Sequence, residues 1–230
     1  RYYNLKNAEA ITYGGQFSIR WIENKMNVYL NKVLKTKGED YVIASDTDSI
    51  YLNMGPLVKT VYEGREKTDE SIVRFLDKIC QVELEPYIES SYKELAEYVS
   101  AYDQKMIMKR ENIASSGIWT AKKRYMLNVW DSEGVRYNKP KLKMMGIEAV
   151  KSSTPAPCRT AIKDAINIMM TGTEKDLLSF IDRFKDEFNL LPPEDIAFPR
   201  SVNGLRKFKA SGTVYTKGTP LHVRGTLLYN

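Results

Sequence analysis

The amino-acid sequence predicts an α+β fold in which an antiparallel sheet is flanked by helices and followed by a mostly helical segment. Apolar residues recur at helical spacing before residue 35 and again between 69 and 100. Outside these stretches, the first two thirds of the chain carries short β-branched and aromatic runs joined by tight turns, which is typical of antiparallel strands. A stretch rich in proline and serine at 151–157 then divides the chain into two expected units, 1–150 and 151–230.

The first 35 residues are expected to form a helix. Their apolar side chains recur at i, i+4, i+7, i+8 and i+11, which places them on one face of a 3.6-residue period. These side chains are Ile22, Met26, Tyr29, Leu30 and Val33. Gly38 is the expected C-terminal cap of this helix. A second helical pattern runs from Asp69 to Ser100 and is interrupted near Pro86, where proline kinks a helix or starts a new one.

The predicted strands begin with a hairpin. Two apolar runs, at 41–45 and 49–52, are separated by three polar residues, Asp46, Thr47 and Asp48. From residue 104 onward the pattern is again that of extended chain. The expected order is a turn at 115–117, a strand at 118–130, a turn at 131–134, a strand at 135–137 and another at 141–145.

The second unit is expected to begin with helices. Thr154 is a good N-cap and Pro155 suits the first helical position, so a helix is expected from there to about residue 170. Gly172 interrupts the pattern, and a second helix is expected from Thr173 to about residue 189. Beyond Pro192 the chain is basic, and loops are expected there.

Composition argues against several classes of protein. With 43% hydrophobic and 28% charged residues, the chain has an ordinary globular composition rather than that of a disordered protein. No run approaches the ~20 apolar residues of a membrane-spanning helix, so no membrane partner is expected. Cys80 and Cys158 form no CxxC pair, which suggests a reducing compartment such as the cytoplasm. His222 is the only histidine, which argues against His-based zinc sites and His-dependent triads. The chain starts at Arg1 without a methionine, and a longer parent protein is expected.

Positive charge is concentrated in two parts of the chain. Residues 105–151 contain eleven basic residues against four acidic ones, a net +7, whereas the whole chain carries +6. Residues 200–224 contain six Lys or Arg and no acidic residue. Such local fields indicate a polyanionic partner, although a solvated face with scattered lysines is the alternative. Aromatic residues lie among the basic ones in the first stretch, which favours nucleic acid over a membrane. These aromatics are Trp119, Tyr125, Trp130 and Tyr137.

The most specific chemical feature is the pair Asp46 and Asp48. In extended chain, residues i and i+2 point the same way, so both carboxylates are expected on one side of the hairpin. Carboxylate oxygens suit Mg²⁺ or Mn²⁺, and two such ions can support phosphoryl transfer. An isolated DxD is also compatible with a plain turn, and sugar-nucleotide transferases use a similar motif.

Four segments follow one another in an order that identifies a family. They are Asp46-Thr-Asp-Ser49, Lys122-Lys-Arg-Tyr125, Lys141-Leu-Lys-Met-Met-Gly-Ile-Glu148 and Lys151-Ser-Ser-Thr-Pro155. Together they strongly resemble the family B replicative DNA polymerases of T4-like bacteriophages, and the resemblance covers the whole chain. It implies a palm domain for 1–150, a largely helical thumb for 151–230, and a host-cell cytoplasmic location.

The resemblance also implies roles for individual residues. Asp46 and Asp48 correspond to the metal-holding motif of the palm and would serve two Mg²⁺ ions, or Mn²⁺, with Asp48 as the more direct ligand. Glu111 corresponds to a nearby palm carboxylate, although an ion pair with Arg110 or Lys109 is an equally good interpretation. If 122–125 is a strand, Lys123 and Tyr125 share one face and are the better candidates for the minor groove. The expected DNA-binding residues are Lys122, Lys123, Arg124, Tyr125, Lys141, Lys143, Lys151, Ser152, Ser153, Thr154 and Arg224.

The sequence also departs from the family pattern. Ala44 and Ser45 stand where the family has Tyr-Gly, and Lys109 stands where close relatives carry Asp. The DxxSLYPS segment of the palm and the lysine-rich fingers helix do not occur, so little or no polymerase activity is expected of this chain alone. Its expected partners are primer–template DNA, a deoxynucleoside triphosphate and a complementary polymerase half.

Two other functions are weighed against the polymerase. A non-catalytic DNA-binding module would keep the basic sheet and the thumb without using the acid pair. A DxD glycosyltransferase is disfavoured, because no Rossmann-like βαβ alternation surrounds the motif.

Overall fold

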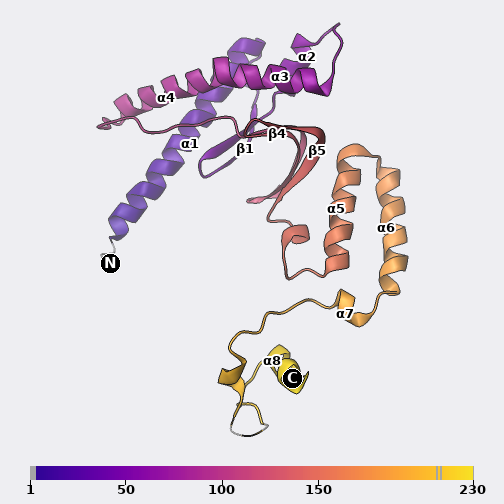
Figure 1. The fold of residues 1–230 in the computed structure, drawn as a ribbon. Helices are drawn as coiled ribbons and strands as arrows, with labels where there is room; N and C mark the ends of the chain where they lie inside the picture. The colour runs from indigo at the N-terminus through magenta and orange to yellow at the C-terminus, as the bar shows by residue number, and fades with distance from the viewer. Residues whose placement is uncertain (1–3, 211, 213, 230) are drawn as a thin grey trace. The chain divides into compact units, whose positions relative to one another are not determined.

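The computed structural model of the chain describes residues 4–210, 212 and 214–229, and the predicted α+β class is confirmed (Figure 1). The chain divides into two compact units, Arg1–Lys143 and Met144–Asn230. None of the helices in the described part of the chain combines the length and apolar character needed to span a bilayer.

In the residues that the structure describes, the first unit contains four α-helices, a π-helical turn and the strands of both sheets. Its helical elements are α1 (Leu5–Leu34), α2 (Gly55–Val61), α3 (Asp69–Ile79), the π-helical turn (Cys80–Leu84) and α4 (Glu85–Tyr98). Its strands are β1 (Val42–Asp46), β2 (Ser49–Leu52), β3 (Asn112–Ala121), β4 (Arg124–Ser132) and β5 (Val135–Met145), the last of which runs past the boundary between the units.

The helix α1 confirms the first predicted helix. The Asn4 side chain caps its first turn by accepting a hydrogen bond from the Asn7 backbone N–H. The expected cap at Gly38 is wrong, because the helix ends at Leu34 and Lys35 takes the left-handed conformation with φ 56°. The apolar face is also narrower than predicted, since Val33 remains 46% exposed.

The main core of the first unit lies where α1 packs on α4 and on the β1–β2 hairpin. Its buried members are Ile22, Met26, Leu30, Tyr41, Val42, Leu84, Ile88, Tyr92 and Leu95. The Trp21 indole N–H donates to the Ser91 carbonyl at 2.9 Å, which ties the two helices together. This core therefore holds the base of the β1–β2 hairpin against two long helices.

The predicted break near Pro86 is confirmed, and it has a defined form. Between α3 and α4 the helix continues through a π-helical turn, and Pro86, which has no backbone N–H to donate, follows this turn at the start of α4. The start of α3 is fixed by a capping box between Thr68 and Ser71. The short helix α2 was not predicted from the sequence.

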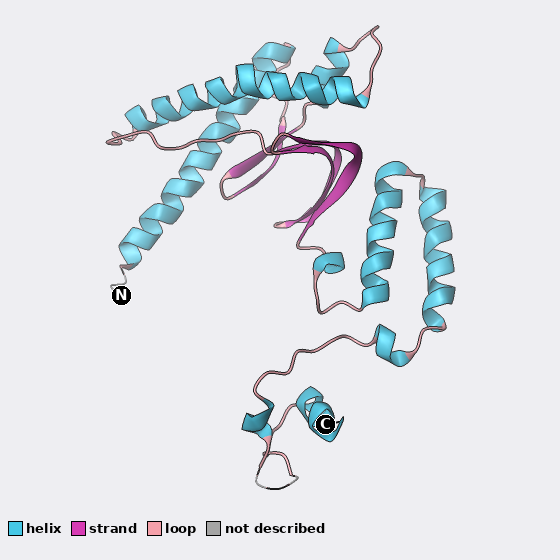
Figure 2. Cartoon of the chain, viewed as in Figure 1, coloured by secondary structure: helices cyan, strands magenta, loops and turns pink. Residues whose placement is uncertain are grey.

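The strands β3, β4 and β5 form a sheet in that order, and β3 pairs antiparallel with β4 (Figure 2). The expected turn at 115–117 is wrong, because β3 continues through it with irregular register. Gly117 has a packing role instead: a Cβ there would approach a Leu127 methyl and the Trp119 ring to 2.7 Å. The strands expected separately at 135–137 and 141–145 are one strand, β5. The turn within 131–134 is confirmed.

The second unit begins with the helical hairpin expected from the sequence. Its helical elements are a short 3-10 turn (Glu148–Val150), α5 (Ala156–Thr171), α6 (Glu174–Asn189), α7 (Pro193–Ile196), a second 3-10 turn (Leu205–Phe208) and α8 (Leu221–Tyr229). The predicted break at Gly172 and the helix expected from about Thr173 are confirmed, and Thr173 is the N-cap of α6. The expected cap at Thr154 is wrong: α5 starts two residues later, after Pro155, and Thr154 is buried. The helices beyond residue 192 were not predicted.

Candidate active site

The tip of the β1–β2 hairpin holds both members of the predicted acid pair. Asp46 pairs with Ser49, so Thr47 and Asp48 are a two-residue turn, and Thr47 has φ 55°. The Asp48 N–H and the Ser49 hydroxyl both donate to the Asp46 carbonyl, at 2.6 and 3.1 Å. The argument from strand alternation is therefore wrong, because Asp48 lies in the turn and not two positions along one strand from Asp46.

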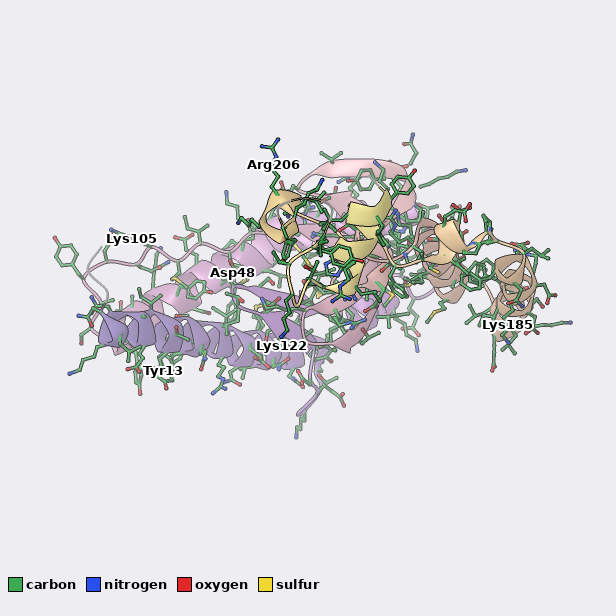
Figure 3. The ribbon with its side chains drawn as sticks, turned by 90° about the horizontal axis from the view of Figure 1, so that it is seen from below. Tyr13, Asp48, Lys105, Lys122, Lys185 and Arg206 are labelled. Atoms are coloured by element: carbon green, nitrogen blue, oxygen red, sulfur yellow. The ribbon has the colours of Figure 1, made fainter. Side chains whose placement is uncertain are left out.

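The carboxylate of Asp46 already has a cationic partner. Lys123 Nζ lies 3.0 Å from Asp46 Oδ1, and the Thr47 hydroxyl donates to the same oxygen at 3.1 Å. The hydrogen bond from Lys123 is the main reason that the pKa of the Asp46 carboxyl lies below its ordinary value. Lys123 has φ 59° and forms the β3–β4 turn together with Lys122, which is exposed there (Figure 3).

Because 122–123 is a turn, the predicted alternation of faces along 122–125 is wrong. Tyr125 begins the buried pattern of β4 and is only 7% exposed. Its ring packs edge-on against Tyr51 at 5.4 Å, and Tyr51 packs on Trp119 at 5.3 Å. Burial first, and then the hydrogen bond with Tyr125, raises the pKa of the Tyr51 hydroxyl, which stays neutral. Tyr51 faces Ala44 across the hairpin, so an aromatic ring does stand beside that position.

A cavity of about 660 Å³ lies between β2, the segment 107–117 and the π-helical turn. Asp48 and Glu111 both line it, as does Lys109. Its apolar lining includes Leu84, Ile88 and Leu127. Two effects raise the pKa of the Tyr92 hydroxyl. Burial is the larger one, and the negative charge of Asp48 adds to it.

The predicted acid Glu111 is more than half exposed and has a lysine partner that the sequence reasoning did not identify. Lys143 Nζ on β5 lies 3.3 Å from Glu111 Oε1. The alternative of an ion pair with Arg110 or Lys109 is wrong for Arg110, whose guanidinium contacts Asp77 and Asp131. Glu111 is therefore brought to the same cavity as Asp48, whereas Asp46 is held by Lys123 at the side of the hairpin.

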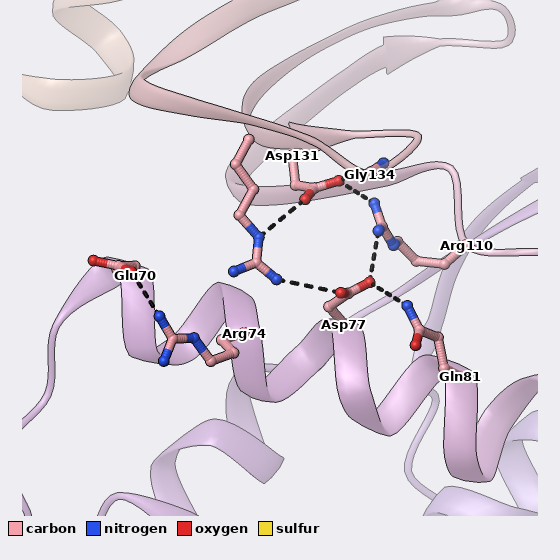
Figure 4. A network of polar contacts seen from close by, with 8 residues as sticks. Glu70, Arg74, Asp77, Gln81, Arg110, Asp131 and Gly134 are labelled. Atoms are coloured by element: carbon pink, nitrogen blue, oxygen red, sulfur yellow. Dashed lines mark hydrogen bonds and ion pairs between the residues drawn. The ribbon is translucent and has the colours of Figure 1, made fainter.

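Next to the cavity lies a closed ring of four charges, which we call the charge ring. It consists of Asp77, Arg110, Asp131 and Arg136 (Figure 4). Asp131 is fully buried and also accepts a hydrogen bond from the Gly134 N–H at 3.0 Å. Sequence reasoning missed this ring, because its members come from α3, from the segment before β3, from β4 and from β5. The one local signal was an Asp close before a turn that contains glycine.

Of the remaining expected DNA-binding residues, Thr154 is buried, and most of the others are exposed on their own units. In the first unit, Lys141 is exposed and its ammonium lies 4.1 Å from the centroid of the Tyr137 ring. In the second unit, Lys151, Ser152 and Ser153 are exposed, and Lys151 pairs with Glu148 at 3.1 Å.

Arg224, the last of the expected DNA-binding residues, lies on α8 in the second unit. Its Nε donates to the Thr219 carbonyl at 2.8 Å, and its guanidinium lies 5.4 Å from the centroid of the Tyr215 ring. The residue is nevertheless exposed, so part of its guanidinium faces solvent.

Carboxylate oxygen is the donor type that Mg²⁺ and Mn²⁺ prefer, and Asp48 and Glu111 offer it in one cavity. Among residues 4–210, 212 and 214–229, no three His, Cys, Asp or Glu side chains are grouped to hold a metal ion. The residues present thus fit a divalent cation in kind, and supply part of a ligand set.

No family model matches the chain. Two curated relatives do match it over its whole length. One is a DNA-directed DNA polymerase of Escherichia phage RB69, 42% identical over 238 residues, and the other is that of Enterobacteria phage T4, 37% identical over 237 residues. The chain spans 26% of the length of each relative. These matches confirm the resemblance stated from the sequence.

Proposed function

We propose that this chain, which resembles T4-like phage DNA polymerases from end to end, is the palm and thumb portion of a DNA-directed DNA polymerase, with the palm at 1–150 and the thumb at 151–230. The reaction would be attack of a primer 3′ oxygen on the α-phosphate of a deoxynucleoside triphosphate, which forms a phosphodiester bond while the bond between the α- and β-phosphates breaks and pyrophosphate leaves. The observation that carries the proposal is that Asp48 and Glu111, which are 63 residues apart in sequence, line one cavity beside a lysine-rich turn.

Asp46 and Asp48 would hold Mg²⁺, with Glu111 beside them, and the bound ions would polarise the phosphate and lower the pKa of the attacking hydroxyl. The chain's own part is to present these carboxylates on a rigid hairpin. The two-residue turn and its hydrogen bonds fix Asp48, and the aromatic contacts of Tyr51 hold the hairpin on β4. Lys123 and Thr47 both contact Asp46 Oδ1, so a cation would bind Asp46 through Oδ2 or would replace the lysine on Oδ1.

The basic residues would bind the DNA backbone. In the first unit these would be Lys122 and Lys123 at the β3–β4 turn, Arg124 on β4, and Lys141 and Lys143 on β5. In the second unit, Lys151, Ser152, Ser153 and Thr154 precede α5, and Arg224 lies on α8. Their contribution is electrostatic, so binding should weaken steeply as salt rises.

The proposed enzyme needs parts that the residues of this chain do not supply. Since the chain spans 26% of its relatives, the other palm carboxylate and the fingers would come from a complementary half. We place the assembled enzyme in the host-cell cytoplasm, on the strength of the phage relatives. Primer extension by a mixture of this chain and a candidate complementary half, with Mg²⁺ and deoxynucleotides, tests the proposal.

Extension by the mixture but by neither chain alone is the expected result. Asp48→Asn should abolish it, and Asp182→Asn, an exposed aspartate on α6, is the matched control that should not. Extension that survives Asp48→Asn would contradict the assignment of the acid.

A second function, a DNA-binding module that is not catalytic, is favoured by the ion pair that engages Asp46. Asp46→Ala and Asp48→Ala separate the two functions. In the reconstituted enzyme, the polymerase proposal requires both variants to lose synthesis while DNA affinity changes little. Unchanged synthesis in both variants would favour the binding module.

A further inference from the structure

The charge ring lies directly behind a residue of the proposed active site. Arg110 precedes Glu111, and its guanidinium is about nine-tenths buried between Asp77 on α3 and Asp131 on β4. In extended chain, successive side chains point to opposite sides. The Arg110 side chain is held in the ring, whereas the Glu111 carboxylate pairs with Lys143, and Glu111 lines the same cavity as Asp48.

The backbone on both sides of this peptide is held as well. The Arg110 N–H donates to Glu85 Oε1 at 3.0 Å, and the Glu111 carbonyl accepts from the Glu133 N–H at 2.6 Å. Residues 110–111 are therefore anchored to the start of α4, to α3 through Asp77, and to the turn between β4 and β5. Two of these anchors are helices and the third is the tight turn that joins β4 to β5, so the direction of Glu111 depends on elements outside its own segment.

We propose that Arg110 is a positioning residue for Glu111: the charge ring sets the direction in which the Glu111 carboxylate faces the cavity that it shares with Asp48. This inference rests on the proposed function, in which Glu111 serves the metal site. Groups that orient the ligands of a metal typically change its affinity 10–100-fold when they are altered.

The ring provides its own matched control. Arg136 contacts the same two carboxylates, at 3.2 Å to Asp77 and 3.4 Å to Asp131, but it lies on β5 and does not line the cavity. Lysine carries a point charge and lacks the planar fork that lets arginine bridge two carboxylates. Arg110→Lys and Arg136→Lys thus make the same chemical change in the same ring, and only the first adjoins Glu111.

The experiment measures Mn²⁺ binding to the whole chain by electron paramagnetic resonance, at a temperature where thermal melting shows that every variant is folded. Arg110→Lys should weaken Mn²⁺ binding 10–100-fold, and Arg136→Lys should leave it close to that of the unsubstituted chain. Equal weakening in the two variants would overturn the proposal and reduce the ring to a stabilising element. If Arg110→Lys does not fold, Asp77→Asn is measured instead, because in that variant Arg110 keeps its ion pair with Asp131.

A double-mutant cycle with Glu111→Gln shows whether Arg110 acts through Glu111. In the Glu111→Gln background, Arg110→Lys should cause no further loss of Mn²⁺ affinity, because the group that it positions is already gone. Losses that multiply in the double variant would mean that Arg110 acts by another route, which would also overturn the proposal.

A second readout does not depend on metal. Hydrogen exchange of the peptide covering residues 109–113, measured without Mn²⁺, should be faster in Arg110→Lys and unchanged in Arg136→Lys. If the unsubstituted chain binds Mn²⁺ no better than Asp48→Asn, the metal site of the proposed function is wrong, and this readout alone decides the positioning role. Faster exchange in both variants, or in neither, would then overturn it.

Discussion

Two aspartates near strand ends in the first unit show how one residue type serves two purposes. Asp46 ends β1 and Asp131 lies one residue before the end of β4, and each precedes a two-residue turn with a positive φ, at Thr47 and at Glu133. Locally they are nearly equivalent. The Asp46 side chain is 27% exposed and pairs with one lysine, whereas the Asp131 side chain is 1% exposed.

The difference lies in the partners that the fold supplies. Asp131 has two guanidinium groups and a backbone N–H, so its charge is committed to holding α3, β4 and β5 together. Asp46 has the flexible, exposed ammonium of Lys123 and a neighbouring hydroxyl, which a metal ion could replace. Burial and the number of fixed cationic partners, rather than the residue type or the turn, distinguish a structural carboxylate from one that is free to act.

The largest loss of stability is expected for Asp131→Asn. It leaves two arginines near one remaining carboxylate in a buried site, and removal of one partner from a buried ion pair costs about 3–5 kcal/mol. Urea unfolding should show this loss as a lower midpoint with an unchanged slope. Asp46→Asn is the control and should cost less than ~1 kcal/mol. Similar losses in the two variants would break the distinction.

The second test concerns the acid at the turn. Asp48→Asn should weaken Mn²⁺ binding to the chain by more than ~100-fold, a larger effect than that of altering an orienting group. The stability of the fold should hardly change, because Asp48 is exposed and lies in the turn. Titration by electron paramagnetic resonance measures the affinity. An unchanged dissociation constant would remove Asp48 from the proposed metal site.

The lysines at the β3–β4 turn provide a third, smaller effect. Lys122→Gln should weaken binding to primer–template DNA and lower the slope of log affinity against log salt by about 1, the effect of one lost phosphate contact. Fluorescence anisotropy at several salt concentrations measures both quantities. Lys185→Gln on α6, an exposed lysine paired with Asp182, is the control. Equal slopes for the two variants would argue against DNA contact at this turn.

The smallest effect is the pH dependence of the Asp46–Lys123 pair. The folded-state pKa of Asp46 is lowered, so the pair stabilises the fold above the unfolded pKa of Asp, near 3.9, and that stability is lost as pH falls through the folded pKa. Relative to Lys123→Met, the unsubstituted chain should be more stable by at most ~1 kcal/mol at pH 6 and by nothing at pH 2. A difference that grows toward acid would have the wrong sign.

Much of the local structure could be predicted from the sequence, because periodicity and turn chemistry depend on near neighbours. The spacing of Ile22, Met26 and Leu30 predicted the buried face of α1, and the Asp-Thr-Asp run predicted the β1–β2 hairpin. The errors share a different cause. Ser115–Gly117 resembles a turn, yet Gly117 is needed because Leu127 and Trp119 from the folded sheet occupy the space beside it.

The candidate site likewise has features that depend on near neighbours in the sequence and features that depend on contacts between distant residues. The position of Asp46 and Asp48 at a hairpin tip followed from their neighbours, although their relative orientation did not, since that depends on how many residues the turn uses. The convergence of Asp48 with Glu111, the pairing of Lys123 with Asp46, and all but one contact of the charge ring join residues more than twenty positions apart. No local pattern encodes such contacts.

The π-helical turn at Cys80–Leu84 links two parts of the first unit that otherwise look independent. A π turn adds one residue to a helix, and each residue advances the helix by about 100°. On one side of it, Asp77 faces the arginines of β5 and of the segment before β3; on the other side, Ile88 and Tyr92 face α1. Deleting a single residue of the π turn would restore an ordinary α-helix. Either Asp77 would then be rotated away from the arginines, or Ile88 and Tyr92 would be rotated away from α1. The inserted residue therefore changes the angle between the two faces of one continuous helix, so that the first face contacts the arginines while the second packs against α1.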